Sequence, residues 1–136
     1  MKRTQIREIA FQLLYSVEVQ KEIEEEQIQL FLEENAIEEE EQINYIKETF
    51  QGVQEHKETI EQLIANNLKE NWTMQRIAKI DLAILKLAIY EMVFVKLPYK
   101  VVINEAVELA KKYGDDNAKS FVNGILASIV KEEKLA

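Results

Sequence analysis

The sequence of 136 residues contains no cysteine, one histidine, one proline and three glycines. Without cysteine the chain has no disulfide, no thiol nucleophile and no thiolate metal site, and one histidine excludes metal sites that need two. The glycines are too scattered for a phosphate-binding loop, and the serines lie in no nucleophile motif. We therefore expect a protein that is not an enzyme and that binds neither a metal nor another cofactor.

Long apolar runs are also missing. The most apolar stretch, residues 80–95, is interrupted by Asp81, Lys86 and Glu91, so no segment reaches the length that a membrane-spanning helix needs. The charged first residues are not followed by the apolar run of a signal peptide. Together with the absence of cysteine, which suits a reducing compartment, this predicts a cytoplasmic protein.

Acidic residues outnumber basic ones, and the formal net charge of −8 argues at first against nucleic-acid binding. The excess is local, because 10 of the 25 acidic residues lie within residues 22–41, a stretch without Lys or Arg. Elsewhere, 15 acidic residues face 17 Lys and Arg. The rest of the chain can therefore present a basic surface, and we interpret the acidic stretch as a solvated helix and loop.

Apolar residues recur every three or four positions, which is the spacing of one face of an α-helix. The pattern predicts helices at residues 3–19, 27–34, 39–68, 80–95 and 100–113 and after residue 117; the helix that includes 80–95 begins near Thr73 or Asp81. We expect a break in the long helix near Gly52 or His56. No segment has the alternation of a strand, so the prediction is an all-α fold, a compact bundle of about six to seven helices.

Helix ends follow from local chemistry. Pro98 should stop the apolar helix at 80–95, which is expected to be surrounded by the others. Gly114 should cap the next helix, and residues 115–117 (Asp-Asp-Asn) should cap the start of the last one. Trp72, in a turn, is expected to anchor the core. His56 is expected at an exposed helix position.

The first candidate RNA-binding segment lies at the amino end. From Arg3 through Arg7 and Phe11 to Tyr15 the spacing is four, and Lys2 precedes them, so these side chains form a stripe along the first helix. Cations hold phosphates, and aromatic rings stack on the bases of a single strand. The alternative is that the two rings belong to the edge of the core and the three cations only solubilise the end.

The second candidate segment, residues 111–121, joins the last two predicted helices. It combines Lys111, Lys112 and Lys119 with Tyr113 and Phe121, and the start of a helix can bind a phosphate through its backbone N–H groups. The alternative is an ordinary cap with Phe121 buried, in which the two aspartates of the turn would oppose an anion.

Three stretches carry a resemblance to the NusB family. They are residues 3–15 (RTQIREIAFQLLY), residues 80–92, which contain LKLAIYEM, and residues 98–114 (PYKVVINEAVELAKKYG) followed by 119–126 (KSFVNGIL). The last block is the most specific. The resemblance covers essentially the whole chain and preserves the order and spacing of the motifs.

This resemblance implies two packed helical subdomains within a single NusB-like RNA-binding domain, residues 1–136. It also implies a transcription antitermination factor that binds boxA-type single-stranded RNA of ribosomal RNA leaders together with ribosomal protein NusE. The expected larger complex contains NusA, NusG and RNA polymerase. Family members include monomers and homodimers. The alternative function is a protein-interaction module of the same fold without direct RNA binding.

The resemblance also implies roles for individual residues. RNA-binding residues are expected at Lys2, Arg3, Arg7, Tyr15, Tyr113, Asn117, Lys119 and Phe121, and partner-binding residues at Asp81 and Lys86, on the helix that faces NusE. Neutral Thr4 and Gln5 stand where family members often have arginine, which predicts weaker RNA binding and a flatter salt dependence.

Three further expectations concern residues of these motifs. The variant Arg7→Ala should weaken RNA binding and leave the fold intact. Asn104 and Glu105 should form a network at a helix start. Gly124, with Asn123, should allow close packing of helices.

Overall fold

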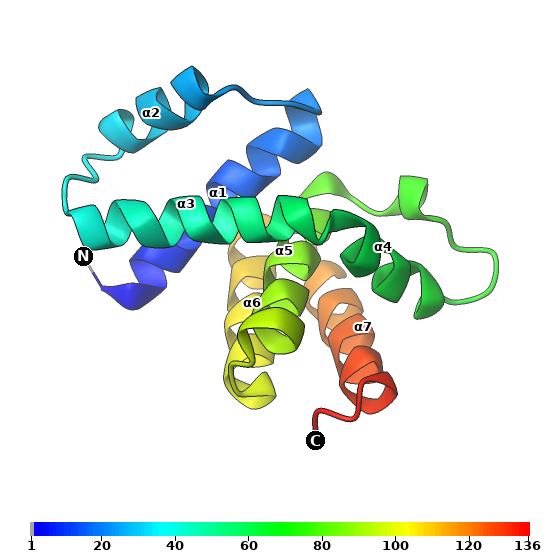
Figure 1. Ribbon diagram of the computed structural model, residues 1–136. Helices are drawn as coiled ribbons and strands as arrows, with labels where there is room; N and C mark the ends of the chain where they lie inside the picture. The colour runs from blue at the N-terminus through cyan, green and yellow to red at the C-terminus, as the bar shows by residue number, and fades with distance from the viewer. Residues whose placement is uncertain (1) are drawn as a thin grey trace.

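The computed structural model describes residues 2–136 (Figure 1). Its helices are α1 (Arg3–Gln20), α2 (Glu25–Glu34), α3 (Glu40–Glu55), α4 (Lys57–Asn66), α5 (Lys79–Ile89), α6 (Tyr99–Tyr113) and α7 (Ala118–Glu132), with a 3-10 turn, η1 (Met74–Arg76), and a π-helix, η2 (Tyr90–Val95). Every regular element of this range is helical, so the prediction of an all-α fold is confirmed.

The predicted helices are present with small shifts at their ends. Helix α2 begins two residues before the prediction, and the side-chain oxygen of Gln27 accepts a hydrogen bond from the backbone N–H of Glu24 at 2.8 Å. This bond satisfies one N–H at the start of the helix, where no backbone partner exists. Helix α6 begins at Tyr99, one residue early, with Pro98 at its cap.

The predicted break of the long helix is confirmed and lies at His56, between α3 and α4. The His56 ring stacks on Phe94 of η2 with the ring centroids 3.8 Å apart, so His56 is half-buried rather than exposed as expected. Gly52 does not break the helix. It is buried in α3, and an added Cβ would overlap the Tyr90 side chain, so glycine is needed here for close approach to η2.

Helix α5 passes directly into the wider π-helix η2, which the sequence pattern did not predict. The backbone N–H of Leu97 donates to the Glu91 carbonyl at 3.0 Å, and Lys96 adopts a left-handed conformation with φ 69°. The helix therefore ends at Val95, three residues before Pro98. Residues that precede a proline disfavour the helical region, which agrees with an end shortly before Pro98.

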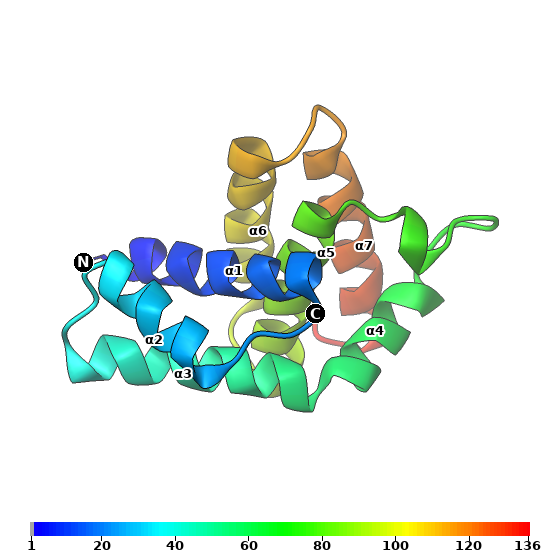
Figure 2. The same ribbon diagram turned by 90° about the horizontal axis from the view of Figure 1, so that it is seen from above.

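The helices form two groups that share α1. Helices α2 and α3 lie on one side of α1, and α6 and α7 stand on the other, as seen from above (Figure 2). The turn between α6 and α7 projects at one end of the second group. None of the described helices combines the length and the apolar character required to cross a bilayer.

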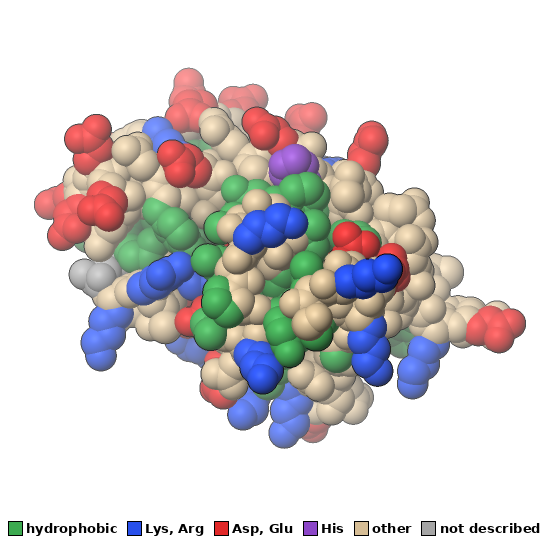
Figure 3. Space-filling model, turned by 60° about the horizontal axis from the view of Figure 1, so that its bottom comes forward, with side chains coloured by type: hydrophobic (Ala, Val, Ile, Leu, Met, Phe, Trp, Pro, Cys, Tyr) green, Lys and Arg blue, Asp and Glu red, His purple; other side chains and the backbone are tan. Residues whose placement is uncertain are grey.

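Charges are segregated on the surface. Figure 3 shows acidic side chains gathered mainly along one edge of the face in view, whereas Lys and Arg side chains occupy most of the opposite half. The glutamates of residues 22–41 are exposed at the start of α3, on α2 and in the segments before and after it. The basic half is consistent with the sequence-based expectation that the remaining chain can present a basic surface.

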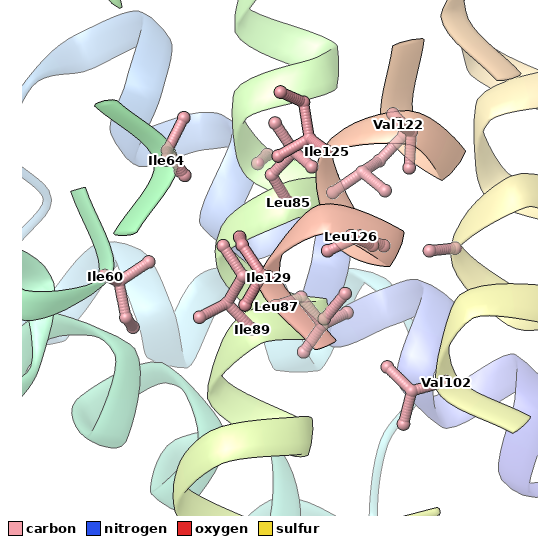
Figure 4. Close-up of a cluster of buried hydrophobic side chains, with 14 of the residues drawn as sticks. Ile60, Ile64, Leu85, Leu87, Ile89, Val102, Val122, Ile125, Leu126 and Ile129 are labelled. Atoms are coloured by element: carbon pink, nitrogen blue, oxygen red, sulfur yellow. The ribbon is translucent and has the colours of Figure 1, made fainter. Parts of the chain in front are cut away.

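Two clusters of buried side chains hold the groups together. The larger surrounds α5, whose Leu85, Leu87 and Ile89 pack against side chains of α4, α6 and α7 (Figure 4). The smaller lies between α1, α2 and α3 and consists of Ile6, Ile9, Leu13, Ile28, Leu32, Ile37 and Ile46. Helix α1 contributes Phe11 and Leu14 to the larger cluster. The prediction that the apolar helix is surrounded by the others is therefore confirmed, and so are two packed helical subdomains.

Two expectations about packing are wrong. Trp72 is not a core anchor, because 44% of its surface is exposed. Gly124 does not allow close helix packing, because nothing lies within 4 Å of the position that its Cβ would occupy. Both residues instead border the same surface hollow, described below.

Candidate nucleic-acid interface

A row of three aromatic rings joins α1 to the end of α6. The centroids of Phe11 and Tyr113 are 5.0 Å apart, and those of Phe11 and Tyr15 are 6.5 Å apart. Phe11 is buried, whereas Tyr15 and Tyr113 are half-buried. The structure thus brings the amino-terminal segment against the segment before the last helix, although they are about a hundred residues apart in sequence.

Polar groups beside these rings form a second link between α1 and α6. The Tyr113 hydroxyl accepts a hydrogen bond from Gln12 Nε2 at 3.0 Å and donates one to Glu8 Oε2 at 2.9 Å. Lys112 Nζ donates to the two Glu8 oxygens at 3.0 and 2.8 Å. The hydrogen bond and charge of Glu8 raise the pKa of Lys112. Burial, assisted by Glu8, raises the pKa of the Tyr113 hydroxyl, which therefore keeps its proton at neutral pH.

Of these side chains, Glu8 and Lys112 border a hollow that we name the α1–α6 groove. It has a volume of about 500 Å³ and is lined by Thr4, Arg7, Glu8, Asn104, Glu105, Glu108, Leu109, Lys111 and Lys112. Asn104 and Glu105 lie within α6 rather than at its start. The expected network at a helix start is therefore wrong for this pair, and Glu105 forms an ion pair with Arg7 of α1 instead.

Arg7 is not a surface cation, since only 4% of the residue is exposed. Its Nε donates to Glu91 Oε2 at 2.7 Å, a second nitrogen bonds the other Glu91 oxygen, and the third pairs with Glu105. Burial lowers the pKa of Arg7, but the hydrogen bond and charge of Glu91 outweigh this effect, so the pKa is raised. The Arg7 charge is therefore compensated inside the protein.

Lys2 and Arg3 are exposed at the start of α1. Arg3 lines a different hollow of about 400 Å³, together with Ile6, Gln42 and Tyr45 and two glutamates at the start of α3. Arg3 thus lies on the α3 side of α1, whereas Phe11 faces Tyr113 of α6. The stripe predicted from a spacing of four is divided between two sides of the helix, with buried Arg7 between them.

The start of α7 presents the exposed residues Asn117 and Lys119. Asn117 occupies the cap position, as predicted, but its side chain makes no capping hydrogen bond. Instead the Asp115 carboxylate accepts a bond from the Asn117 backbone N–H at 2.9 Å. The Asn117 side chain is therefore available at the surface beside Lys119.

Phe121 lies in another hollow, between α7 and the connection from α4 to α5. Its ring centroid is 6.4 Å from that of Trp72, and the Arg76 guanidinium carbon lies 5.4 Å from the Trp72 ring centroid. The hollow has a volume of about 610 Å³ and also contains Asn67, Lys69, Ser120, Gly124, Ile125 and Ser128. The sequence pattern pointed to Phe121 but not to the exposed Trp72 beside it. The turn residues on both sides of Trp72 were the available signal, because they remove it from any helical face.

The residues expected to bind a partner are both buried in α5. One Asp81 carboxylate oxygen has no hydrogen-bond partner among residues 2–136, and burial, together with the charge of Asp115, raises the pKa of Asp81. Lys86 donates to Glu18 of α1 at 2.6 Å and to Glu61 of α4 at 2.9 Å. Lys86 therefore joins three helices, and neither residue has the exposed position that direct contact with a partner requires.

The arrangement suits binding rather than catalysis. Among the described residues, no group of His, Cys, Asp or Glu could hold a metal ion. The surface around α1, the end of α6 and the start of α7 combines lysines, half-buried rings and amide groups. Lysines bind phosphates, and rings and amides bind bases, so the chemistry of this surface fits RNA.

Comparison with known proteins agrees with this assignment. A sequence profile described as the NusB family matches residues 4–131. The transcription antitermination protein NusB of Acetivibrio thermocellus is 46% identical over 132 residues, covering 96% of this chain and 90% of the relative. The structure of T. maritima NusB is similar with a TM-score of 0.85 at 35% identity, covering 97% of this chain and 92% of that one. A chain in a crystal structure of antitermination factors NusB and NusE in complex with dsRNA gives 0.85 at 30% identity and covers 97% and 99%.

Proposed function

Because the chain belongs to the NusB family, we propose that it is a transcription antitermination factor that binds RNA together with ribosomal protein NusE. The role is one of binding and not of catalysis, as for the curated relative, a transcription antitermination protein. The observation that carries the RNA-binding part is the contact of α1 with the end of α6, where Phe11 meets Tyr113 and Glu8 meets Lys112.

The finer parts of the proposal concern the RNA and the larger complex. The RNA is a boxA-type single strand of ribosomal RNA leaders, bound in the cytoplasm, and the larger complex contains NusA, NusG and RNA polymerase. A homodimer that covered the RNA surface would prevent RNA binding. Residues 1–136 act as a single RNA-binding domain.

The proposed RNA surface uses the exposed members of the predicted set. Lys2, Arg3 and Lys119 attract phosphates, and Asn117 hydrogen-bonds bases or phosphates. Tyr15, Tyr113 and Phe121 are half-buried and offer the accessible parts of their rings to bases. Arg7 contributes by holding α1 against α6 through Glu91 and Glu105.

The NusE contact is proposed near the first turn of α5. Asp81 and Lys86 are buried, so they hold this region in place, and exposed neighbours touch NusE. RNA binding is then linked to NusE binding. A partner that enlarges a weakly binding RNA surface raises the affinity for RNA, although no contact between RNA and this chain is added. Capture of the chain by immobilised NusE tests this part, and we expect Asp81→Lys, which places a large cation beside Gly114, to abolish capture.

The test of RNA binding is a fluorescence-anisotropy titration with the chain alone and mixed with NusE. Three RNAs are compared: a boxA-type single strand, the same strand in a duplex, and a scrambled single strand. We expect the tightest binding for the boxA-type strand with NusE present. No binding to any RNA by the mixture would overturn the proposal.

Two lysine variants test whether the RNA binds at the proposed surface. Lys119→Ala should weaken binding and reduce the slope of log K against log salt by about 0.7, the value for one phosphate contact of a single strand. Lys57→Ala, which removes an exposed lysine of α4, is the matched control and should change neither. An equal effect of the two variants would argue against the proposed surface.

The second candidate is a protein-interaction module without direct RNA binding. It is favoured by the internal pairing of three cations, Arg7, Lys86 and Lys112, which leaves fewer charges for phosphates. Tight binding of NusE, together with no RNA binding by the mixture, would support this candidate.

A further inference from the structure

The α1–α6 groove contains its own counter-charges. Each cation that lines it is paired with a carboxylate that lines it too: Arg7 with Glu105, Lys111 with Glu108, and Lys112 with Glu8. Glu8 differs from the other two carboxylates because its oxygens bind two different side chains of α6, the Lys112 ammonium and the Tyr113 hydroxyl.

The Glu8 contact is the one of these that joins two helices and can still open. The Lys112 side chain is 60% exposed and that of Glu8 is 27% exposed, and ion pairs in such positions contribute little to stability because water screens them. The pair of Lys111 with Glu108 is also exposed, but both residues lie on α6. Both Arg7 pairs involve a buried guanidinium, with only 5% of the Arg7 side chain exposed, so opening either pair would leave a buried charge less well compensated.

The oxygens of Glu8 do what an RNA phosphate would do at this place. A phosphate also offers negative oxygens to an ammonium and a hydroxyl donor, and such charge-assisted bonds are short and strong. Tyr113 would stay in position when Glu8 leaves, because Gln12 of α1 still donates to its hydroxyl and Phe11 still contacts its ring.

We propose that Lys112, which lines the α1–α6 groove, and the adjacent Tyr113 hydroxyl form an RNA-phosphate subsite, and that Glu8 occupies this subsite in the free protein as a built-in competitor. The inference rests on the RNA-binding function proposed above and adds a residue that opposes it. RNA must displace the Glu8 carboxylate before a phosphate reaches Lys112. The Glu8 carboxylate lowers the affinity of the protein for every RNA. Strands whose other contacts with the protein do not offset the displacement of Glu8 remain unbound.

The test is the variant Glu8→Gln, measured with the boxA-type single strand and NusE at about 0.15 M salt. The amide still accepts a bond from Tyr113 but no longer neutralises Lys112. We expect about two- to fivefold tighter binding, the range that corresponds to an exposed ion pair, and a salt slope steeper by about 0.7. A purely structural role of Glu8 would give the opposite sign.

The matched control is Glu38→Gln, which removes one exposed carboxylate from the loop between α2 and α3. This variant changes the net charge by the same amount as Glu8→Gln. Because Glu38 does not line the α1–α6 groove, we expect the affinity for RNA to stay unchanged. A second control is the double variant Glu8→Gln with Lys112→Ala, which should bind no more tightly than Lys112→Ala alone. Thermal unfolding checks that every variant is folded.

The outcomes separate the two proposals. RNA binding by the wild-type chain, with equal or weaker binding by folded Glu8→Gln, would overturn the competitor role alone. A gain that persists in the double variant would also overturn it, because the gain would then not arise at Lys112. If neither the wild-type chain nor any variant binds RNA with NusE present, the proposed function fails and the subsite with it.

Discussion

Arg7 carries the same charge as its neighbours Lys2 and Arg3, but its position gives it a different task. Its guanidinium lies between Glu91 of η2 and Glu105 of α6, and it is almost completely buried. The sequence showed a cation in line with other cations, and it could not show the two carboxylates, which lie more than eighty residues away. Long-range partners of this kind decide whether a charge faces RNA or holds the fold.

The buried position changes the prediction for Arg7→Ala. Removing one partner of a buried ion pair costs roughly 3–5 kcal/mol, so we expect the free energy of unfolding to fall by about this amount. Chemical denaturation followed by circular dichroism measures it. Arg3→Ala, at an exposed position, is the control and should cost little. An unchanged unfolding midpoint for Arg7→Ala would contradict the buried pair.

A double variant tests whether Arg7 and Glu91 act as a unit. Arg7→Met combined with Glu91→Met removes both charges and leaves no uncompensated ion in that pair. We expect its loss of stability to be smaller than the sum of the losses of the two single variants. Additive losses would show that the residues act independently.

Asp81 is the second residue whose environment alters its chemistry. Burial and the neighbouring Asp115 raise its pKa above the ordinary value, so the folded protein holds the Asp81 proton more tightly than the unfolded chain does. The contribution of Asp81 to stability is therefore most favourable at acid pH and is lost as the pH rises through the raised pKa.

This sign predicts that Asp81→Asn stabilises the protein at pH 7, and that the gain shrinks as the pH falls below the pKa of Asp81 in the folded protein. Unfolding temperatures measured between pH 4 and pH 7, about the range above an ordinary aspartate pKa, check the expectation. Asp116→Asn, at an exposed position in the α6–α7 turn, is the control. Lower stability of Asp81→Asn at pH 7 would contradict the raised pKa.

At the scale of elements, helices with one apolar stripe were predictable. Helices α1 and α6 lie within one residue of the predicted ends, because their stripes and end residues agree. The π-helix η2 was not predictable, since the same apolar residues fit an α-helix. Its wider turn depends on contacts from another element, Gly52 and His56 of the α3 region against Tyr90 and Phe94.

The candidate interface also has parts that were predictable from the sequence and parts that were not. The aromatic spacing of α1 and the lysines at the end of α6 identified segments that do meet in the fold. The split between Arg3 on the α3 side and Phe11 on the α6 side was hidden, because a spacing of four drifts around the helix axis. The exposed Trp72 was also missed, because a large apolar residue is more often found in a core.

Two glycines inside helices provide a contrast at this scale. Gly124 is exposed in α7 with open space around it, so Gly124→Ala should stabilise the protein by about 0.5–1 kcal/mol through helix propensity. Gly52→Ala should destabilise it by about 1–3 kcal/mol, because the new methyl group would overlap the Tyr90 side chain. Thermal unfolding compares the two variants, and effects of equal sign would contradict the packing around Gly52.

At the scale of the whole molecule, the net charge of −8 conceals an uneven distribution: 10 of the 25 acidic residues lie within residues 22–41, and on the face shown in Figure 3 acidic and basic side chains occupy different parts. Charges separated by more than about 8 Å are largely screened at physiological ionic strength. The acidic stretch at residues 22–41 should therefore slow and weaken RNA binding at low salt and have little effect at physiological salt.

This prediction is tested with the triple variant Glu33→Gln, Glu34→Gln and Glu38→Gln, at three exposed positions in or after α2. We expect tighter RNA binding than for the wild-type chain at about 0.02 M salt and equal binding at about 0.15 M. A difference that persists at the higher salt would mean that these carboxylates lie close to the bound strand.

Helix α1 belongs to both hydrophobic clusters, and its Arg7 is bonded to Glu91 and Glu105. During synthesis this helix leaves the ribosome first, since chains emerge from the amino end. Its side chains in the smaller cluster can pack as soon as α2 and α3 have been made, but burial of Phe11, Leu14 and Arg7 needs α5, η2 and α6, which follow much later in the sequence. One side of the oldest helix must therefore stay exposed until most of the protein has been translated.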